Sequence, residues 1–193
     1  MGRSADYTIL RTDFEGDPIT YDPCKPVHYV INPSGGPGDY LSFVEPAIKK
    51  AQAATGLKFV YDGQTDDTWA TRGSVTKSEP VLISFSSSMD SSVADRDAVG
   101  LGGSTWMTVD GRSQPHYLTG RVELLSTWFA RESAVNGTGA EESVVMHELG
   151  HVLGLGHAHH RNEVMYREAH GQAEYGPGDL SGLARLGAGS CAG

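Results

Sequence analysis

The stretch HELGHVLGLGH, from His147 to His157, contains three histidines and one glutamate at fixed intervals. On an α-helix, His147 and His151 lie one turn apart on the same side, about 6 Å between β-carbons, so both imidazoles can reach one metal ion. Gly154 can adopt positive φ, and we expect it to end the helix and let His157 return towards the same ion. The stretch therefore predicts three nitrogen ligands on a helix and the turn after it.

The residue types in this stretch favour a catalytic zinc ion. Three neutral imidazoles leave the fourth tetrahedral position of Zn²⁺ to water, whereas structural sites fill all four positions with protein. Zinc lowers the pKa of such a water to about 7. Glu148 follows the first ligand directly and projects beside the metal, where a general base is needed. The sequence predicts one Zn²⁺ and hydrolysis of a peptide bond.

The residues before His147 extend the helix towards the N-terminus. Thr138 and Glu141 fit a capping box, so the helix is expected to begin near Gly139. At about 100° per residue, one apolar stripe collects beside the stripe that carries the ligands. The apolar stripe, which we expect to face the core, contains Val145, Leu149, Val152 and Leu153.

Upstream of this helix, alternating and helical patterns indicate a layered α/β arrangement. A helix is predicted from Asp39, a capping-type residue, to Thr55, with Gly56 at its end. A long loop through His116 separates the last two predicted strands. The predicted strands cover residues 27–31, 57–63, 80–86, 101–111 and 121–130.

Length and charge limit the classes of protein and partner. The 193 residues suit a single domain spanning 1–193, and the net charge is −9 with no basic stripe. Nucleic acid is therefore not expected as a partner. No segment has the 18 or more apolar residues of a membrane span, so we expect a soluble protein.

The two cysteines, Cys24 and Cys191, would close almost the whole chain into one loop if they were joined. We interpret them as a disulfide and predict an oxidising, extracellular compartment. The alternative is a pair of buried thiols in a cytosolic protein.

Other groups that could bind metals are interpreted as ordinary structural residues. Asp90, Asp95 and Asp97 offer oxygen ligands of the kind that Ca²⁺ prefers, but a solvated loop is the favoured interpretation. Four further histidines are interpreted as packed or solvent-exposed side chains that bind no metal, and these are His28, His116, His159 and His160.

The segment from His147 to His157 resembles the extended zinc signature H-E-x-x-H-x-x-G-x-x-H of the metzincin metallopeptidases. In EVMYREA, Met165 lies eight residues beyond His157 and Tyr166 follows it, and this pair is similar to the methionine turn of the matrixins, the family of the matrix metalloproteinases. GDLSGLARLG, residues 178–187, is similar to the C-terminal helix of that family. Arg167 stands where other metzincins place a tyrosine that reaches the zinc.

This resemblance implies a zincin-like α/β (α+β) fold. It implies a five-stranded mixed, twisted sheet with three main helices, and an active-site cleft between an upper part, about 20–154, and a small lower part, about 155–193. It also implies that Met165 forms a floor beneath the histidines and that Tyr166 walls the pocket for the side chain after the scissile bond. Gly154 would have the structural role described above.

We therefore expect a secreted, monomeric zinc endopeptidase with Glu148 as general base. An extended polypeptide substrate would pair with an exposed sheet edge around Gly103 to Thr108. One alternative is a zinc-stabilised module that binds peptides without turnover, although Glu148 is intact. Another is a zinc hydrolase of non-peptide amides, which the methionine turn disfavours.

Overall fold

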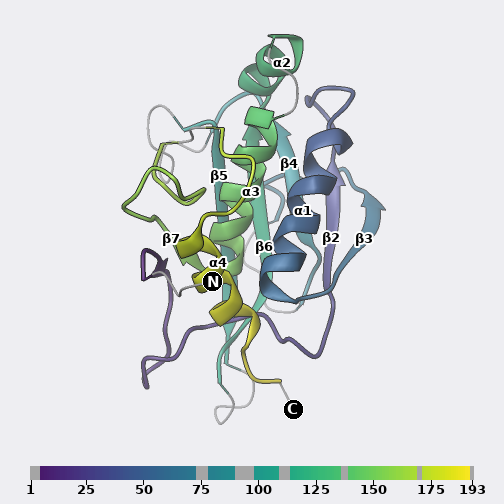
Figure 1. Ribbon diagram of the computed structural model, residues 1–193. Helices are drawn as coiled ribbons and strands as arrows, with labels where there is room; N and C mark the ends of the chain where they lie inside the picture. The colour runs from purple at the N-terminus through teal and green to yellow at the C-terminus, as the bar shows by residue number, and fades with distance from the viewer. Residues whose placement is uncertain are drawn as a thin grey trace.

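A mixed five-stranded sheet forms the centre of the molecule (Figure 1). The computed structural model describes residues 5–72, 78–89, 98–108, 114–135, 139–168 and 171–191. The strand order is β3-β2-β4-β6-β5; the first four strands are parallel, and β5 runs antiparallel to β6. This confirms the predicted mixed sheet. The strands are β2 (Val27–Asn32), β3 (Phe59–Gln64), β4 (Val81–Ser86), β5 (Gly100–Met107) and β6 (His116–Leu125).

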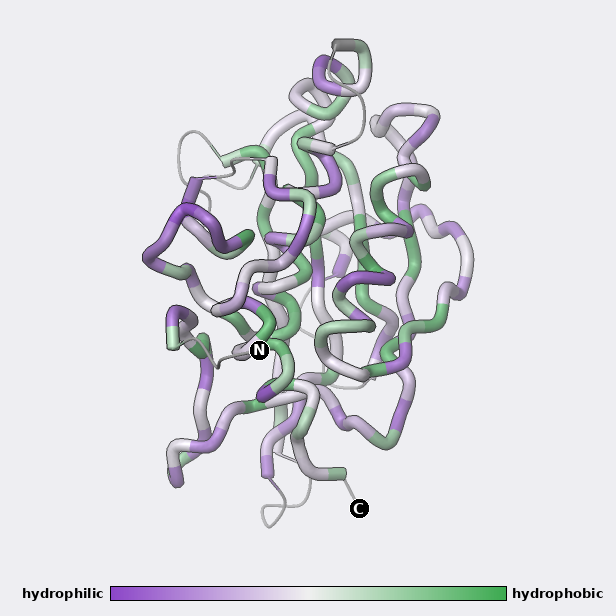
Figure 2. The backbone as a smooth tube through the Cα atoms, viewed as in Figure 1, coloured by the Kyte–Doolittle hydropathy of each residue, from purple (hydrophilic) through white to green (hydrophobic). Residues whose placement is uncertain are grey.

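Two long helices, α1 (Leu41–Thr55) and α3 (Gly139–Leu153), lie side by side against one face of the sheet (Figure 1). The shorter α4 (Pro177–Gly187) packs at the lower end of this pair. The apolar stripe predicted on α3 is fully buried. Hydrophobic residues concentrate on these central elements, while the peripheral loops are largely hydrophilic (Figure 2). None of the helices in the described ranges is long and apolar enough to cross a membrane.

Two local expectations were wrong. The residues after Leu125 do not continue the strand, because Ser126–Val135 forms helix α2, whereas β6 begins earlier than expected, at His116. Phe129, expected on a strand, is fully buried from this helix and packs edge-on against Phe85 of β4. A short apolar run does not distinguish strand from helix, and here tertiary packing decides. The Thr138 capping prediction lies outside the described residues.

The start of α1 also differs from the prediction. The helix begins at Leu41 after Tyr40, and no side chain caps it, so Asp39 is not the N-cap. Its C-terminal end is as expected, since Gly56 has φ of 76° and its N–H donates to the Gln52 carbonyl.

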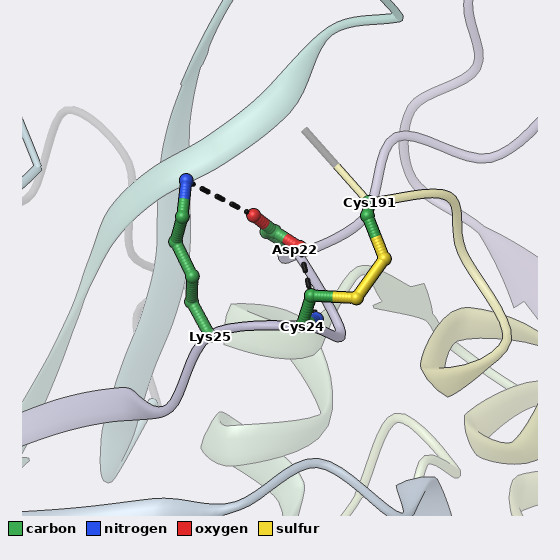
Figure 3. Close-up of a disulfide and its surroundings, with 4 residues drawn as sticks. All are labelled: Asp22, Cys24, Lys25 and Cys191. Carbon is green, nitrogen blue, oxygen red and sulfur yellow. Dashed lines mark hydrogen bonds and ion pairs between the residues drawn. A yellow bond between two sulfur atoms is a disulfide. The ribbon is translucent and has the colours of Figure 1, made fainter. Parts of the chain in front are cut away.

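The chain ends are tied to the body of the fold. A small antiparallel sheet joins β1 (Thr8–Ile9) to β7 (Leu155–Gly156), directly after α3. The predicted disulfide is present: Cys24, before β2, is joined to Cys191, after α4 (Figure 3). It closes a loop of 167 residues in sequence separation.

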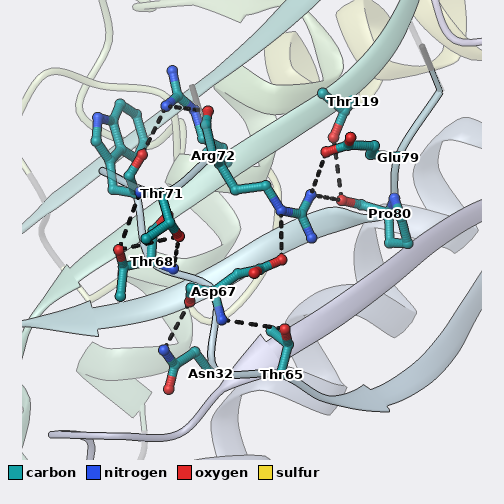
Figure 4. A network of polar contacts seen from close by, with 11 residues as sticks. Asn32, Thr65, Asp67, Thr68, Thr71, Arg72, Glu79, Pro80 and Thr119 are labelled. Atoms are coloured by element: carbon teal, nitrogen blue, oxygen red, sulfur yellow. Dashed lines mark hydrogen bonds and ion pairs between the residues drawn. The ribbon is translucent and has the colours of Figure 1, made fainter. Parts of the chain in front are cut away.

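A buried arginine fixes the connection after β3 to the ends of the neighbouring strands (Figure 4). The Arg72 guanidinium donates through Nε to the Asp67 carboxylate, at 2.9 Å, and through a terminal nitrogen to the Pro80 carbonyl, at 2.6 Å. Arg121 of β6 donates to the Trp69 and Arg72 carbonyls and lies over the Trp69 ring, 4.3 Å from its centroid. These bonds hold the described part of the connection against β4 and β6.

Candidate metal centre

The three histidines of the opening stretch converge. One ring nitrogen from each of His147, His151 and His157 lies within 4.8 Å of the other two, and the ring centroids are 4.7 to 5.3 Å apart. His147 is buried, His151 is half-buried and His157 is exposed, so the cluster opens towards solvent on one side. The predicted helix and turn therefore bring all three candidate ligands together.

Hydrogen bonds fix which ring nitrogen faces the cluster. His147 Nδ1 lies 2.7 Å from the Val164 carbonyl oxygen, and His151 Nδ1 lies 2.8 Å from that of Leu155. A carbonyl only accepts, so each Nδ1 carries the proton and each Nε2 keeps a lone pair for a metal. These two acceptors could not be predicted from the sequence, because they are main-chain atoms of the segment after the helix.

Burial keeps the two helical histidines neutral. It lowers the pKa of His147 to about 4, and it lowers that of His151 to about 3 with help from the neighbouring rings. Neutral imidazoles are the form that binds metals. Nitrogen donors only, a fixed tautomer and an open side suit a catalytic zinc ion, so the residues present fit this metal.

Glu148 lies beside the histidines under the edge strand. Its side chain is buried, and burial raises the pKa of the carboxyl group to about 8. Two glycines of β5 permit this close approach: a Cβ atom at Gly100 would lie 2.6 Å from Glu148 Oε1, and one at Gly102 would overlap the Glu148 carbonyl oxygen. These glycines were not singled out from the sequence, since only the packing of β5 on α3 reveals their role.

The turn after α3 has the predicted conformation at its first glycine. Gly154 has φ of 113°, and its N–H donates to the Gly150 and His151 carbonyls. Gly156 does not have positive φ; it lies in β7, where a Cβ atom would overlap the Thr8 hydroxyl. Gly156 thus allows β1 and β7 to pack closely.

Met165 lies below the helix. It is 1% exposed, and its carbonyl accepts the N–H of Ala158, one residue beyond His157. A Cβ atom at Gly150, between His147 and His151 on α3, would overlap the Met165 sulfur. The glycine therefore lets the methionine approach the ligand-bearing turn.

Two buried acids hold the methionine turn against α4. Asp179 accepts hydrogen bonds from the backbone N–H groups of Val164, Met165 and Gly176. Glu163 in turn accepts from the N–H groups of Gly178 and Asp179. Burial and the Glu163 charge raise the pKa of Asp179 to about 6, against the opposing effect of its backbone donors. The family resemblance pointed to this helix, but the sequence did not assign Asp179 a contact.

The other predicted residues have varied surroundings. Tyr166 is half-buried, and the Arg161 guanidinium carbon lies 5.8 Å from its ring centroid. His28 is exposed and bonds Asp62, while His116 is buried. His159 and His160 are exposed, and both face one carboxylate, that of Asp6, 3.3 and 2.7 Å from their Nδ1 atoms. Asp90, Asp95 and Asp97 lie outside the described residues.

Comparison with protein families identifies a relationship over most of the chain. The model of the matrixin family matches residues 40–184, from the start of α1 to within α4. The match includes the histidine cluster, the methionine turn and Asp179. A search of curated proteins found no match.

Proposed function

Because this chain belongs to the matrixin family of metallopeptidases, we propose that it is a zinc-dependent endopeptidase whose metal is held by His147, His151 and His157. The convergence of these rings, with the Nδ1 atoms of His147 and His151 engaged by carbonyls, is the observation that carries the proposal. Zinc in such a site supplies a bound water that ionises near neutral pH.

Glu148 is proposed as the general base that takes a proton from that water and delivers it to the departing nitrogen of the cleaved peptide bond. Its burial beside His147 supports this assignment, because a carboxylate shielded from bulk solvent has its pKa moved towards the working pH. The zinc charge would act on the same group in the opposite direction to burial.

The substrate is proposed to be an extended polypeptide that pairs with β5. This strand is the outermost of the sheet and packs directly on α3, so a peptide added to its free edge would run past the histidines. Tyr166 follows the buried Met165 and is proposed to wall the pocket for the residue after the scissile bond. Met165 and Gly154 would support the ligands from below and behind.

The disulfide supports a secreted, extracellular protein, because such bonds persist in oxidising compartments. We further propose that residues 1–193 act as a single, monomeric catalytic domain with an upper part, about 20–154, and a lower part, about 155–193.

The test compares the zinc-loaded wild type with Glu148→Gln on an unfolded protein substrate. We expect the variant to keep one bound zinc and to lose about 10²- to 10⁴-fold in kcat/KM, the usual contribution of a positioned general base. Glu45→Gln is the matched control, since Glu45 is exposed on α1 and pairs only weakly with Lys49, at 3.7 Å. Full cleavage by Glu148→Gln would contradict the assignment, and zinc binding without cleavage by wild type would favour a peptide-binding module.

A further inference from the structure

The third histidine lies in a different part of the fold from the other two. His147 and His151 lie on α3, and each ring donates a hydrogen bond to a carbonyl. His157 is exposed and lies beyond the end of that helix. The geometry of the metal centre therefore depends on what fixes residues 154–160, which we call the third-ligand segment.

One side of the third-ligand segment is paired with residues near the N-terminus. Thr8 and Ile9 pair with Gly156 and Leu155 in the small antiparallel sheet, and the Leu10 N–H donates to the Gly154 carbonyl at 2.8 Å. The Thr8 hydroxyl donates to the carbonyl oxygen of His157 itself, at 3.0 Å. This last bond joins residues 149 positions apart in sequence.

Asp6 holds the other end of the segment. Its two carboxylate oxygens accept the backbone N–H groups of His159 and His160, each at 3.0 Å, and also face the two imidazoles. Although burial alone would raise it, the pKa of Asp6 is lowered to about 2 by the His159 N–H and by the side chain and N–H of His160. The carboxylate is thus ionised at neutral pH, and it spans the two residues that follow Ala158.

The lower part of the molecule is shaped to receive this N-terminal stretch, which lies beside β7 and the start of α4 (Figure 1). A Cβ atom at Gly178 would overlap the Asp6 carbonyl oxygen, and one at Gly182 would lie 2.9 Å from the Tyr7 ring. Both glycines belong to α4, so the helix accepts the Asp6 backbone and the Tyr7 ring at van der Waals distance. The N-terminal stretch is therefore closely packed against α4.

We propose that residues 6–10 are a positioning strap that sets the place of His157 in the metal centre. Thr8 acts on the His157 main chain, and Asp6 fixes the two N–H groups that follow, so the imidazole is aimed by contacts from the far end of the chain. Thr8 and Asp6 are positioning residues, because neither side chain belongs to the histidine cluster. This inference rests on the proposed zinc site.

The test measures metal binding and not only cleavage. Zinc affinity is measured by chelator competition in Thr8→Val, which keeps the β-branched shape but removes the donor, and in Thr8→Ser, which keeps the hydroxyl. We expect about 10-fold weaker zinc binding in Thr8→Val, at the lower end for groups that orient metal ligands, and near-wild-type affinity in Thr8→Ser. The visible absorption of the Co²⁺-substituted protein should change in Thr8→Val only.

Asp6→Asn is an independent second variant, and Asp13→Asn is its matched control. Asp13 lies in the same N-terminal region, and its Oδ1 also accepts two backbone N–H groups, but these are the N–H groups of Glu15 and Asp17 and not of residues 154–160. We expect weaker zinc binding and faster amide exchange at 155–160 in metal-free Asp6→Asn, and neither effect in Asp13→Asn.

The proposed strap would be overturned if both Thr8→Val and Asp6→Asn bound zinc within about twofold of the wild-type affinity and had the cobalt spectrum of the wild type. Equal loss in Asp13→Asn would overturn it as well, because the effect would then be one of general stability. Failure of the proposed function would give a different result from failure of the strap. The protein would bind zinc, and Thr8→Val would weaken that binding, but the wild type would cleave no peptide.

Discussion

Helix α3 and the third-ligand segment contribute to the same metal centre by different physical means. On α3 the period of the helix alone places His147 and His151 on one side, four residues apart. In residues 154–160 His157 follows the two-residue strand β7; its main chain is held by Thr8, and Asp6 binds the N–H groups of two residues beyond it. The identity of the ligands is therefore set by local sequence, whereas the position of the third ligand, His157, is set by tertiary contacts.

Removing the disulfide should have the largest effect on stability. It should have the smallest effect on how the two regions hold the metal ligands. Because the bond closes a loop of 167 residues in separation, Cys24→Ser with Cys191→Ser should lower the free energy of unfolding by about 2–5 kcal/mol, mainly through the unfolded chain. Denaturant unfolding measures this loss. Zinc affinity, measured at denaturant concentrations well below the unfolding midpoint, should stay within about twofold of wild type.

The wild type treated with a reductant is the control for the serine substitutions, since these are the only two cysteines. If zinc affinity fell together with stability in both samples, global stability would set the place of His157, and the contrast between the two regions would disappear.

Asp179→Ala tests the tertiary support of the methionine turn. It leaves three buried N–H groups without their acceptor, and removing one partner of a buried hydrogen bond costs about 1–3 kcal/mol, so we expect a loss of about 3 kcal/mol near pH 4. Asp13→Ala, which removes a half-buried carboxylate with two backbone donors, should cost less than about 1 kcal/mol. Thermal and denaturant unfolding compare the two variants.

The cost of Asp179→Ala should also depend on pH. The pKa of Asp179 is raised to about 6 in the folded protein from an ordinary value of 3.8, so between these values the folded state binds more protons than the unfolded state. Its contribution to stability is then greatest below about pH 4 and declines as the pH rises to about 6. The gap between wild type and variant should narrow over that window; a widening gap would contradict the assignment.

The structure was predicted correctly from the sequence where a single helix or turn carries the whole pattern. The α3 stripe, the C-terminal end of α1 at Gly56 and the turn at Gly154 depend on local periodicity and on glycine backbone freedom, and all three are present. Residues 126–130 were assigned to the wrong element because Phe129 is buried equally well from a helix. Local pattern cannot separate these outcomes when packing supplies the deciding energy.

The supporting residues of the site could not be predicted for a different reason. The acceptors of the His147 and His151 Nδ1 atoms are the main-chain carbonyls of Val164 and Leu155, which a residue of any type at those positions would provide. Asp6 and Asp179 act on backbone N–H groups about 153 and 15 positions away. Such contacts exist only once the topology has formed.

Gly150→Ala should give the smallest effect, at a position where α3 packs directly on the methionine turn. Alanine favours a helix interior over glycine by about 1 kcal/mol, which on α3 alone would stabilise the protein. Its Cβ would, however, overlap the sulfur of Met165, which is 1% exposed and cannot move to solvent, and overpacking costs about 1–3 kcal/mol. We expect a net loss of about 1 kcal/mol, measured by denaturant unfolding. Gly139→Ala, on the same helix with no atom within 4 Å of the new Cβ, is the matched control and should not destabilise. If Gly150→Ala were instead stabilising, helix propensity would outweigh the contact with the methionine turn, and α3 would be independent of the segment beneath it.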